Sequence, residues 1–435
     1  MNIYIVEPGD TLESIADMFG VSTEKLIRDN ELDLPSQLVP GQMIVIVYPT
    51  QVHTVMEGES LESIAALYNI TISEILRNNP FIADMQYILY PGLQLNISFN
   101  RTARIETFGY TNSFINRDLL AKTLPYLTYL PIFDYIIDEN GEIIEEGPDD
   151  DIIEMATLHG ALPLVHLSTI TVQGELDAVT SYRILIDEDF QDIIIENVLN
   201  IIRDKGLYGV VISAQITDEF NHHLFANYAK KFKDTLDREG YQTFITIDPG
   251  IYSDEGVLLY KLIDYGTIAE AVDSILLLEF TWGTTNIPPG PLISVGDQEV
   301  FLNYVLSQTD PENIVVGFPA FGYNWELPYI SGFSNSFILT RDNVINLARG
   351  TGVTIQFDEI SHNSYFYLYE VENTNNNRAY NVVWFVNPKT VDSLIKLSLE
   401  KGINKFGIWN IMFYYAPLWL VINSQYEVVK YLPEI

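Results

Sequence analysis

The stretch GLYGVVISAQ, residues 206–215, is the part of this sequence that best defines its fold. Its apolar run between polar ends predicts a buried β-strand. Alternate side chains of a strand face the same side, so Val211, Ser213 and Gln215 share one face. The residues between them are wholly apolar and suit packing against helices. The stretch therefore predicts a core strand that carries two polar residues at its carboxyl end.

Short apolar runs alternate with helical patterns from residue 104 to residue 435. This alternation predicts βα units and a parallel sheet, and eight strands are the count for a closed (β/α)8 TIM barrel. The expected strands are 105–108, 127–137, 162–167, 209–215, 243–247, 274–280, 314–318 and 406–410. Active sites of such barrels lie at the carboxyl ends of the strands, where Ser213 and Gln215 fall. Residues 323–390 interrupt the alternation with a helical stretch and several strand-like runs.

An internal repeat occupies the first part of the chain. Five residues recur 49 positions later: Val6, Gly9, Leu12, Ile15 and Asn30 return as Val55, Gly58, Leu61, Ile64 and Asn79. Each copy predicts the order strand, helix, helix, strand (βααβ), over residues 1–48 and 51–97. The connections at 48–51 and 98–103 are short, so we expect the modules to lie against their neighbours.

The repeat resembles the LysM module. The first copy has Tyr4, Val6, Gly9-Asp10-Thr11-Leu12 and Pro40-Gly41-Gln42 at the diagnostic positions. The resemblance implies a glycan groove between the first loop and the loop before the last strand. The implied glycan-binding residues are Gly9, Asp10, Thr11, Leu12 and Asn30 in copy one, and Gly58, Glu59, Ser60, Leu61 and Asn79 in copy two. Lys25, Arg28 and Arg77 are the only Lys and Arg residues of the modules, which favours neutral N-acetylglucosamine oligomers over anionic polymers.

Residues 206–215 are similar to the fourth barrel strand of family-18 glycoside hydrolases, which reads Gly-Tyr-x-Gly-hydrophobic-Asn-Ile-Asp-Phe-Glu. The motifs at 316–329, 356–359 and 407–409 also match that family. The resemblance implies that 323–390 is a small α+β insertion between strands seven and eight. In the family, the Glu protonates the leaving oxygen, the Asp orients the substrate acetamide, and a Tyr after strand six holds its carbonyl. These positions are Gln215, Ser213 and Phe280 here.

These three replacements predict a degenerate catalytic site. Glutamine has no acidic proton, and a serine hydroxyl is too short and cannot be the anion. Three readings remain open: Ser213 and Gln215 satisfy each other in a decayed barrel mouth, they form a neutral glycan pocket, or catalysis has moved to Asp218 or Glu219. The glycan-binding candidates of the barrel are Gln215, Trp282, Tyr323, Trp325 and Trp409, since indole and phenol rings stack on sugars. For Trp384 we expect core packing.

Composition limits the partners. A formal charge of −36, from 59 acids against 23 bases, argues against nucleic acid and against an anionic membrane. We expect no cofactor and no metal. The acidic residues 145–151 predict a solvated loop with an Asp N-cap on the next helix rather than a calcium site. With such a charge we expect self-association only at high salt, with divalent cations or in mild acid.

The two LysM copies and the barrel together resemble the spore cortex-lytic N-acetylglucosaminidases of spore-forming bacteria. No secretory signal is visible, so we expect deposition from the mother-cell cytoplasm onto the spore surface. The expected function is a glycan-binding, non-catalytic structural component of the spore envelope. The alternatives are an active N-acetylglucosaminidase acting on cortex peptidoglycan and an assembly protein without glycan binding.

Overall fold

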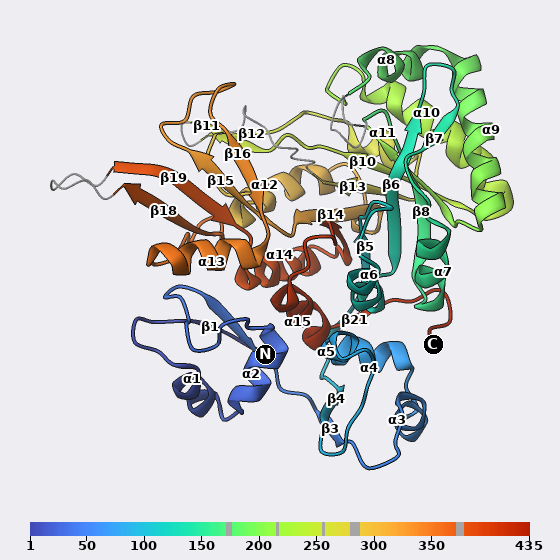
Figure 1. Cartoon of the computed structure of the whole chain (residues 1–435). Coiled ribbons are helices and arrows are strands. Elements are labelled where there is room, and N and C mark those ends of the chain that lie inside the picture. Colours follow the sequence, from blue (N-terminus) through green and yellow to red (C-terminus); the bar gives the residue numbers. More distant parts are fainter. Residues whose placement is uncertain (171–175, 215–216, 255–256, 279–287, 371–377) are drawn as a thin grey trace.

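A closed parallel barrel forms the centre of the computed structural model, which describes residues 1–170, 176–214, 217–254, 257–278, 288–370 and 378–435 (Figure 1). Its eight strands are β5 (Ala103–Gly109), β6 (Tyr129–Ile137), β8 (Leu162–Ser168), β9 (Gly209–Ser213), β10 (Gln242–Ile247), β13 (Ser274–Leu277), β14 (Ile314–Pro319) and β20 (Lys405–Trp409). The pairing of β5 with β6 closes the barrel. The expected TIM barrel is confirmed, although β9 and β13 end at Ser213 and Leu277, before the expected residues 215 and 280.

The two faces of β9 separate as the alternation predicts. Val211 packs inside the barrel with Phe108 and Phe244, whereas Val210 and Ile212 pack outward in the cluster that the helices cover. The covering helices include α6 (Arg117–Thr123), α7 (Asp150–Leu158), α8 (Ala178–Ile186), α9 (Glu188–Lys205), α10 (His222–Leu236), α11 (Tyr265–Ala269), α12 (Val295–Leu306) and α14 (Pro388–Glu400). Among the helices of the described segments, none has the length and apolar character needed to cross a membrane.

An antiparallel sheet projects from the barrel between β14 and β20. Its strands, in sheet order, are β16 (Ser336–Leu339), β15 (Gly322–Glu326), β19 (Arg378–Phe385), β18 (Ser364–Glu370) and β17 (Gln356–Phe357). Helix α13 (Arg341–Thr351) covers one face, where Val344 and Ala348 pack on Phe366 and Val383. We call this sheet and its helix the insertion.

Two small modules precede the barrel. Module 1 contains β1 (Asn2–Ile5), α1 (Leu12–Phe19), α2 (Thr23–Asn30) and β2 (Met43–Ile46). Module 2 contains β3 (Gln51–Thr54), α3 (Leu61–Tyr68), α4 (Ile72–Asn78), a short extra helix α5 (Phe81–Asp84) and β4 (Gln94–Ser98). Thr11 and Ser60 cap α1 and α3 through the same reciprocal hydrogen bonds, so the repeat extends to the local geometry.

The modules pack on each other and on the barrel, as the short connections predict. Arg28 of module 1 lies 4.5 Å from the ring centroid of Phe81 in module 2. Helix α15 (Ala416–Gln425) contacts both modules and is buried along Ala416–Ser424. Both modules lie on the same side of the barrel, with module 1 below α13 and module 2 below α6 (Figure 1).

Candidate active site

The mouth of the barrel, at the carboxyl ends of the strands, carries hydroxyl side chains on β9 and β10 and also two acids, Asp134 on β6 and Asp248 just after β10. Ser213 ends β9 and pairs in register with Thr246 of β10. The Tyr110 hydroxyl lies 3.2 Å from the Thr246 hydroxyl. Three expected site residues, Gln215, Phe280 and Trp282, lie outside the described residues.

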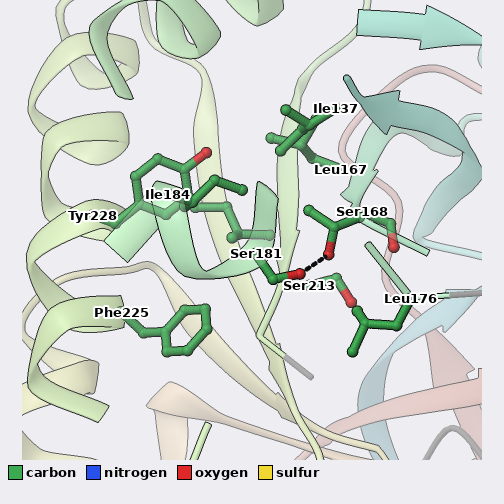
Figure 2. Close-up of a pocket in the computed structure, with 11 residues that line it drawn as sticks. Ile137, Leu167, Ser168, Leu176, Ser181, Ile184, Ser213, Phe225 and Tyr228 are labelled. Carbon is green, nitrogen blue, oxygen red and sulfur yellow. Dashed lines mark hydrogen bonds between the residues drawn. The ribbon is translucent and has the colours of Figure 1, made fainter. Parts of the chain in front are cut away.

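Ser213 lines a small cavity between the strands and the helices. Figure 2 shows its lining, in which Ser181 and Ile184 come from α8, Phe225 and Tyr228 from α10, and Leu167 and Ser168 from β8. The cavity volume is about 20 Å³, room for roughly one water molecule. The hydroxyls of Ser213 and Tyr228 are buried there without a hydrogen bond to any described residue. Burial raises the pKa of Tyr228, so neither hydroxyl is charged at neutral pH.

His166 on β8 is a buried histidine inside the barrel that was not predicted from the sequence. His166 pairs in register with Val211 on β9 and its ring centroid lies 4.4 Å from that of Phe133. Burial lowers the pKa of His166 to about 3, so the imidazole is neutral at physiological pH. A neutral imidazole keeps one N–H but is too weak an acid to serve as a general acid near pH 7. The parity of Leu164, His166 and Ser168 along one strand was the signal that could have found it.

The two acids considered for relocated catalysis lie just beyond β9. One carboxylate oxygen of Asp218 accepts hydrogen bonds from the backbone N–H groups of Phe220 at 2.8 Å and Asn221 at 2.9 Å. Glu219 is exposed. Asp218 thus shapes the turn into α10, which gives it a structural role.

Another buried acid, Asp134 on β6, is also bound to neighbouring structure. Its carboxylate accepts a hydrogen bond from the Asn112 side chain at 3.1 Å and another from the Ser113 backbone N–H. It joins the end of β6 to the loop after β5.

The aromatic candidates of the mouth are packed rather than open. Tyr323, Trp325 and Trp409 are 4%, 3% and 3% exposed. The Trp409 ring lies 5.6 Å from the rings of both Tyr110 and Phe133. These rings fill the mouth, and a sugar would reach them only after the side chains that cover them had moved.

A second aromatic surface is partly open. Trp384 of β19 stacks on Tyr365 of β18, with ring centroids 4.4 Å apart and planes 18° apart. Tyr367 and Tyr369 continue the row on β18, at centroid distances of 6.1 and 6.3 Å. The expectation of core packing for Trp384 is thus only half right, since its ring is half-buried and belongs to this row. The period-two spacing of the three tyrosines was the available signal.

Four of the LysM candidates belong to the interior of the modules. Asn30 donates to the carbonyls of Leu26 and Val45 and accepts from the Val45 N–H, and it is fully buried. Asn79 makes the equivalent three bonds in module 2. Leu12 and Leu61 are buried in the cores of the two modules. The structure places these four residues where they hold helix to strand or fill the core, and the glycan contact expected of them stays a prediction.

The other LysM candidates lie in the first loop of each module. Gly9, Thr11, Gly58 and Ser60 are exposed. Asp10 and Glu59 stabilise their loops. Each carboxylate accepts one hydrogen bond from a backbone N–H of its loop and makes a second hydrogen bond to a side chain on the first strand of its module. The partners are the Tyr4 hydroxyl at 2.7 Å for Asp10 and the His53 ring at 2.8 Å for Glu59.

The acidic loop before α7 is largely exposed, as expected, and Asp149 is the exception. Asp149 stands at the N-cap position but makes no capping bond, and its carboxylate binds the Tyr135 hydroxyl and, at 2.5 Å, the Lys205 ammonium. It is buried rather than solvated. Within the part of the chain that the structure describes, no group of three or more His, Cys, Asp and Glu residues could hold a metal ion.

Comparison with known proteins agrees with this geometry. The LysM domain model matches residues 4–47 and 53–98, and the model of Glycosyl hydrolases family 18 matches residues 165–413. The cortical fragment-lytic enzyme of Bacillus subtilis is 27% identical over 438 residues, which cover 99% of each chain. The putative sporulation-specific glycosylase YdhD of Bacillus subtilis is 25% identical over 420 residues, 96% of this chain and 97% of the relative. The crystal structure of the Bacillus cereus spore cortex-lytic enzyme SleL shares the fold, with a TM-score of 0.77 at 23% identity over 99% of each chain.

Proposed function

Because the chain belongs to glycosyl hydrolase family 18 and carries two LysM domains, we propose that it binds an N-acetylglucosamine-containing glycan without hydrolysing it. Peptidoglycan is the favoured ligand, since the relatives that match nearly the whole chain carry names of cortex-lytic enzymes and glycosylases. We also propose a structural role in the spore envelope, because the same relatives are named for sporulation and for the cortex.

The observation that carries the proposal is the serine at the end of β9. Where the family motif has an aspartate, Ser213 offers a half-buried neutral hydroxyl, and the catalytic glutamate position is Gln215. General acid–base catalysis alone is worth roughly 10²–10⁴ in rate, and electrostatic stabilisation adds to it. Among the described groups nearby, His166 is neutral, and Asp218 and Asp134 are each bound by backbone N–H groups, which favours a structural role for these two acids.

Restoring the motif tests this proposal. The native chain is expected to release no reducing ends from chitin oligomers or cortex glycan. Gln215→Glu alone is expected to restore little, because residues that act as a unit are strongly non-additive. The triple change Ser213→Asp, Gln215→Glu, Phe280→Tyr is expected to restore hydrolysis if the cleft still admits substrate.

An active N-acetylglucosaminidase is the second candidate, favoured by the names of the relatives. Turnover by the native chain that is abolished by Asp218→Asn or Glu219→Gln would establish it and overturn the proposal. A chain that neither hydrolyses glycan nor is retained on it would instead be an assembly protein.

We further propose deposition from the mother cell onto the spore surface and ordered self-association there. A charge of −36 keeps copies apart at low salt, so we expect association to rise with high salt, divalent cations or mild acid. Light scattering under these three conditions is the measurement, and a monomer in all of them would refute self-association. Immunogold labelling of sporulating cells tests the location.

A further inference from the structure

The two LysM modules present the same loop to different surroundings. This is the loop before the last strand, which contains Pro-Gly in both modules. The residue just before Pro-Gly is Val39 in module 1 and Tyr90 in module 2, so these two residues occupy equivalent positions. The glycines that follow, Gly41 and Gly92, have φ of +86° and +91°. Each also donates its N–H to the matching valine carbonyl, at 2.7 Å to Val6 and 2.9 Å to Val55. The loops share one backbone geometry, so their surroundings can be compared position by position.

In module 1 the insertion covers this loop at residues 39–41. Val39 is 2% exposed and packs in the cluster of α13 and the insertion sheet. The Ile355 N–H donates to the Pro40 carbonyl at 2.9 Å. A Cβ at Gly41 would lie 1.9 Å from the Ile355 carbonyl oxygen. The insertion therefore covers residues 39–41, which correspond to the open residues 90–92 of module 2.

Arg349 of α13 fixes the same loop from the side. Its guanidinium donates to the Gln37 carbonyl at 3.0 Å and lies 3.4 Å from the Asp33 carboxylate. These contacts hold the insertion on module 1.

In module 2 the same edge is open and apolar. Tyr90 is 51% exposed and Ile88 is 62% exposed, and a Cβ at Gly92 would meet nothing within 4 Å. Met56, on the facing first loop, is also largely exposed. Aromatic and aliphatic side chains between two loops suit the apolar faces and acetamide methyls of neutral amino sugars.

Charge on module 2 also favours a neutral ligand. Arg77 is the only Lys or Arg between residues 51 and 97, against five acids, Glu57, Glu59, Glu62, Glu74 and Asp84. Arg77 is buried against the barrel and bound to Glu434 and to the Pro125 carbonyl. An anionic polymer would therefore meet net negative charge on this module.

We propose that module 2 alone captures glycan, on the edge formed by Met56, Ile88 and Tyr90, whereas module 1 is an internal brace that positions the insertion. This inference rests on the proposed glycan binding and assigns it to one of the two repeats. The capture edge belongs to the module that docks at the amino ends of the barrel strands, so bound glycan is anchored away from the mouth.

Matched substitutions in the full chain test the assignment, with immobilised N-acetylglucosamine oligomers as the probe. Tyr90→Ala and Ile88→Asp are expected to lower retention at least tenfold and to leave the unfolding midpoint unchanged, because both side chains are exposed. Val39→Ala, at the position equivalent to Tyr90, is expected to lower the midpoint and leave retention unchanged. Gln37→Asp, the counterpart of Ile88→Asp, is expected to change neither.

The outcomes separate the two levels of the argument. Retention that survives both Tyr90→Ala and Ile88→Asp, or that is lost with Gln37→Asp, overturns the assignment while glycan binding stands. A native chain that is not retained overturns the glycan-binding proposal and the assignment together.

Discussion

The two ends of the barrel differ in the partners that their charged side chains bind. At the amino ends of the strands, where module 2 docks, buried arginines and lysines meet acids and carbonyls. At the mouth, the carboxylates of Asp134 and Asp218 accept hydrogen bonds from backbone N–H groups instead, and the imidazole of His166 is neutral. Charge at the amino ends holds domains together, whereas these two acids at the mouth hold loops and turns.

The dock at the amino end is a continuous polar network. Arg77 of α4 binds Glu434 at 2.8 Å, and Arg101 of the linker binds Glu74 at 3.0 Å. The Lys430 ammonium donates to the carbonyls of Leu127 at 2.6 Å and His159 at 2.8 Å. These acceptors lie in module 2 (Glu74), in the C-terminal tail (Glu434) and just before barrel strands (Leu127 and His159), so the network fastens the module to the floor of the barrel.

Breaking the buried pair should have the largest effect. Arg77→Ala leaves the Glu434 carboxylate buried without its strongest partner, which costs about 3–5 kcal/mol of unfolding free energy. Arg203→Ala is the control, because Arg203 and Glu239 form a pair on the surface and such pairs contribute about 0–1 kcal/mol. Urea unfolding of both variants is the measurement. Equal losses would mean that the floor network is no stronger than a surface pair.

Acidification should loosen the same end. Burial, together with the charge of Lys430, lowers the pKa of His159 to about 4. Burial alone would raise the pKa of Glu434, but the charges of Arg77 and Lys430 hold this pKa below its ordinary value. Both folded-state pKa values are depressed, so the contribution of these two groups to stability is complete above about pH 6.5 and falls as the pH drops towards 4, by up to about 3 kcal/mol for His159.

Unfolding midpoints between pH 7 and pH 4 measure this loss. His159→Gln removes one titrating group and is expected to flatten the pH dependence. A midpoint that does not change with pH in the native chain would contradict the cited shifts.

The smallest effect is expected from a matched pair of serines. The Ser73 hydroxyl lies 3.0 Å from the His159 ring, whereas the Ser213 hydroxyl has no hydrogen bond to a described residue. Ser73→Ala should cost about 1 kcal/mol, and Ser213→Ala should change stability by less than about 0.5 kcal/mol. Thermal unfolding of both variants is the measurement. A large loss of stability from Ser213→Ala would show that the Ser213 hydroxyl makes stabilising contacts beyond those described.

The elements that repeat or alternate could be predicted from the sequence. The apolar runs set the eight strands, and the spacing of Val6, Leu12 and their counterparts set the two modules. The roles of single polar residues could not be predicted in this way. Asn30 and Asn79 follow a helix and precede a loop, which suits a ligand contact equally well, and only the fold brings a strand within reach of their amides.

Contacts between domains were also hidden, because composition does not say what a surface meets. Val39 and Tyr90 hold one position in the repeat, and neither residue type reveals that the insertion covers the first and leaves the second open. The stacking of Trp384 on Tyr365 was hidden for a different reason, since this contact within the insertion depends on the register of β18 and β19.

Helix α15 gives the molecule a property that neither the barrel nor the modules have alone. It is buried along Ala416–Ser424 and touches module 1, module 2 and the barrel at once. Because this helix is buried on all sides, removal of any neighbour exposes apolar surface, and exposed apolar surface promotes aggregation. The two LysM domains therefore form part of the packing around this helix. Removal of residues 1–97 would expose apolar side chains of α15, so we expect the remaining barrel to aggregate.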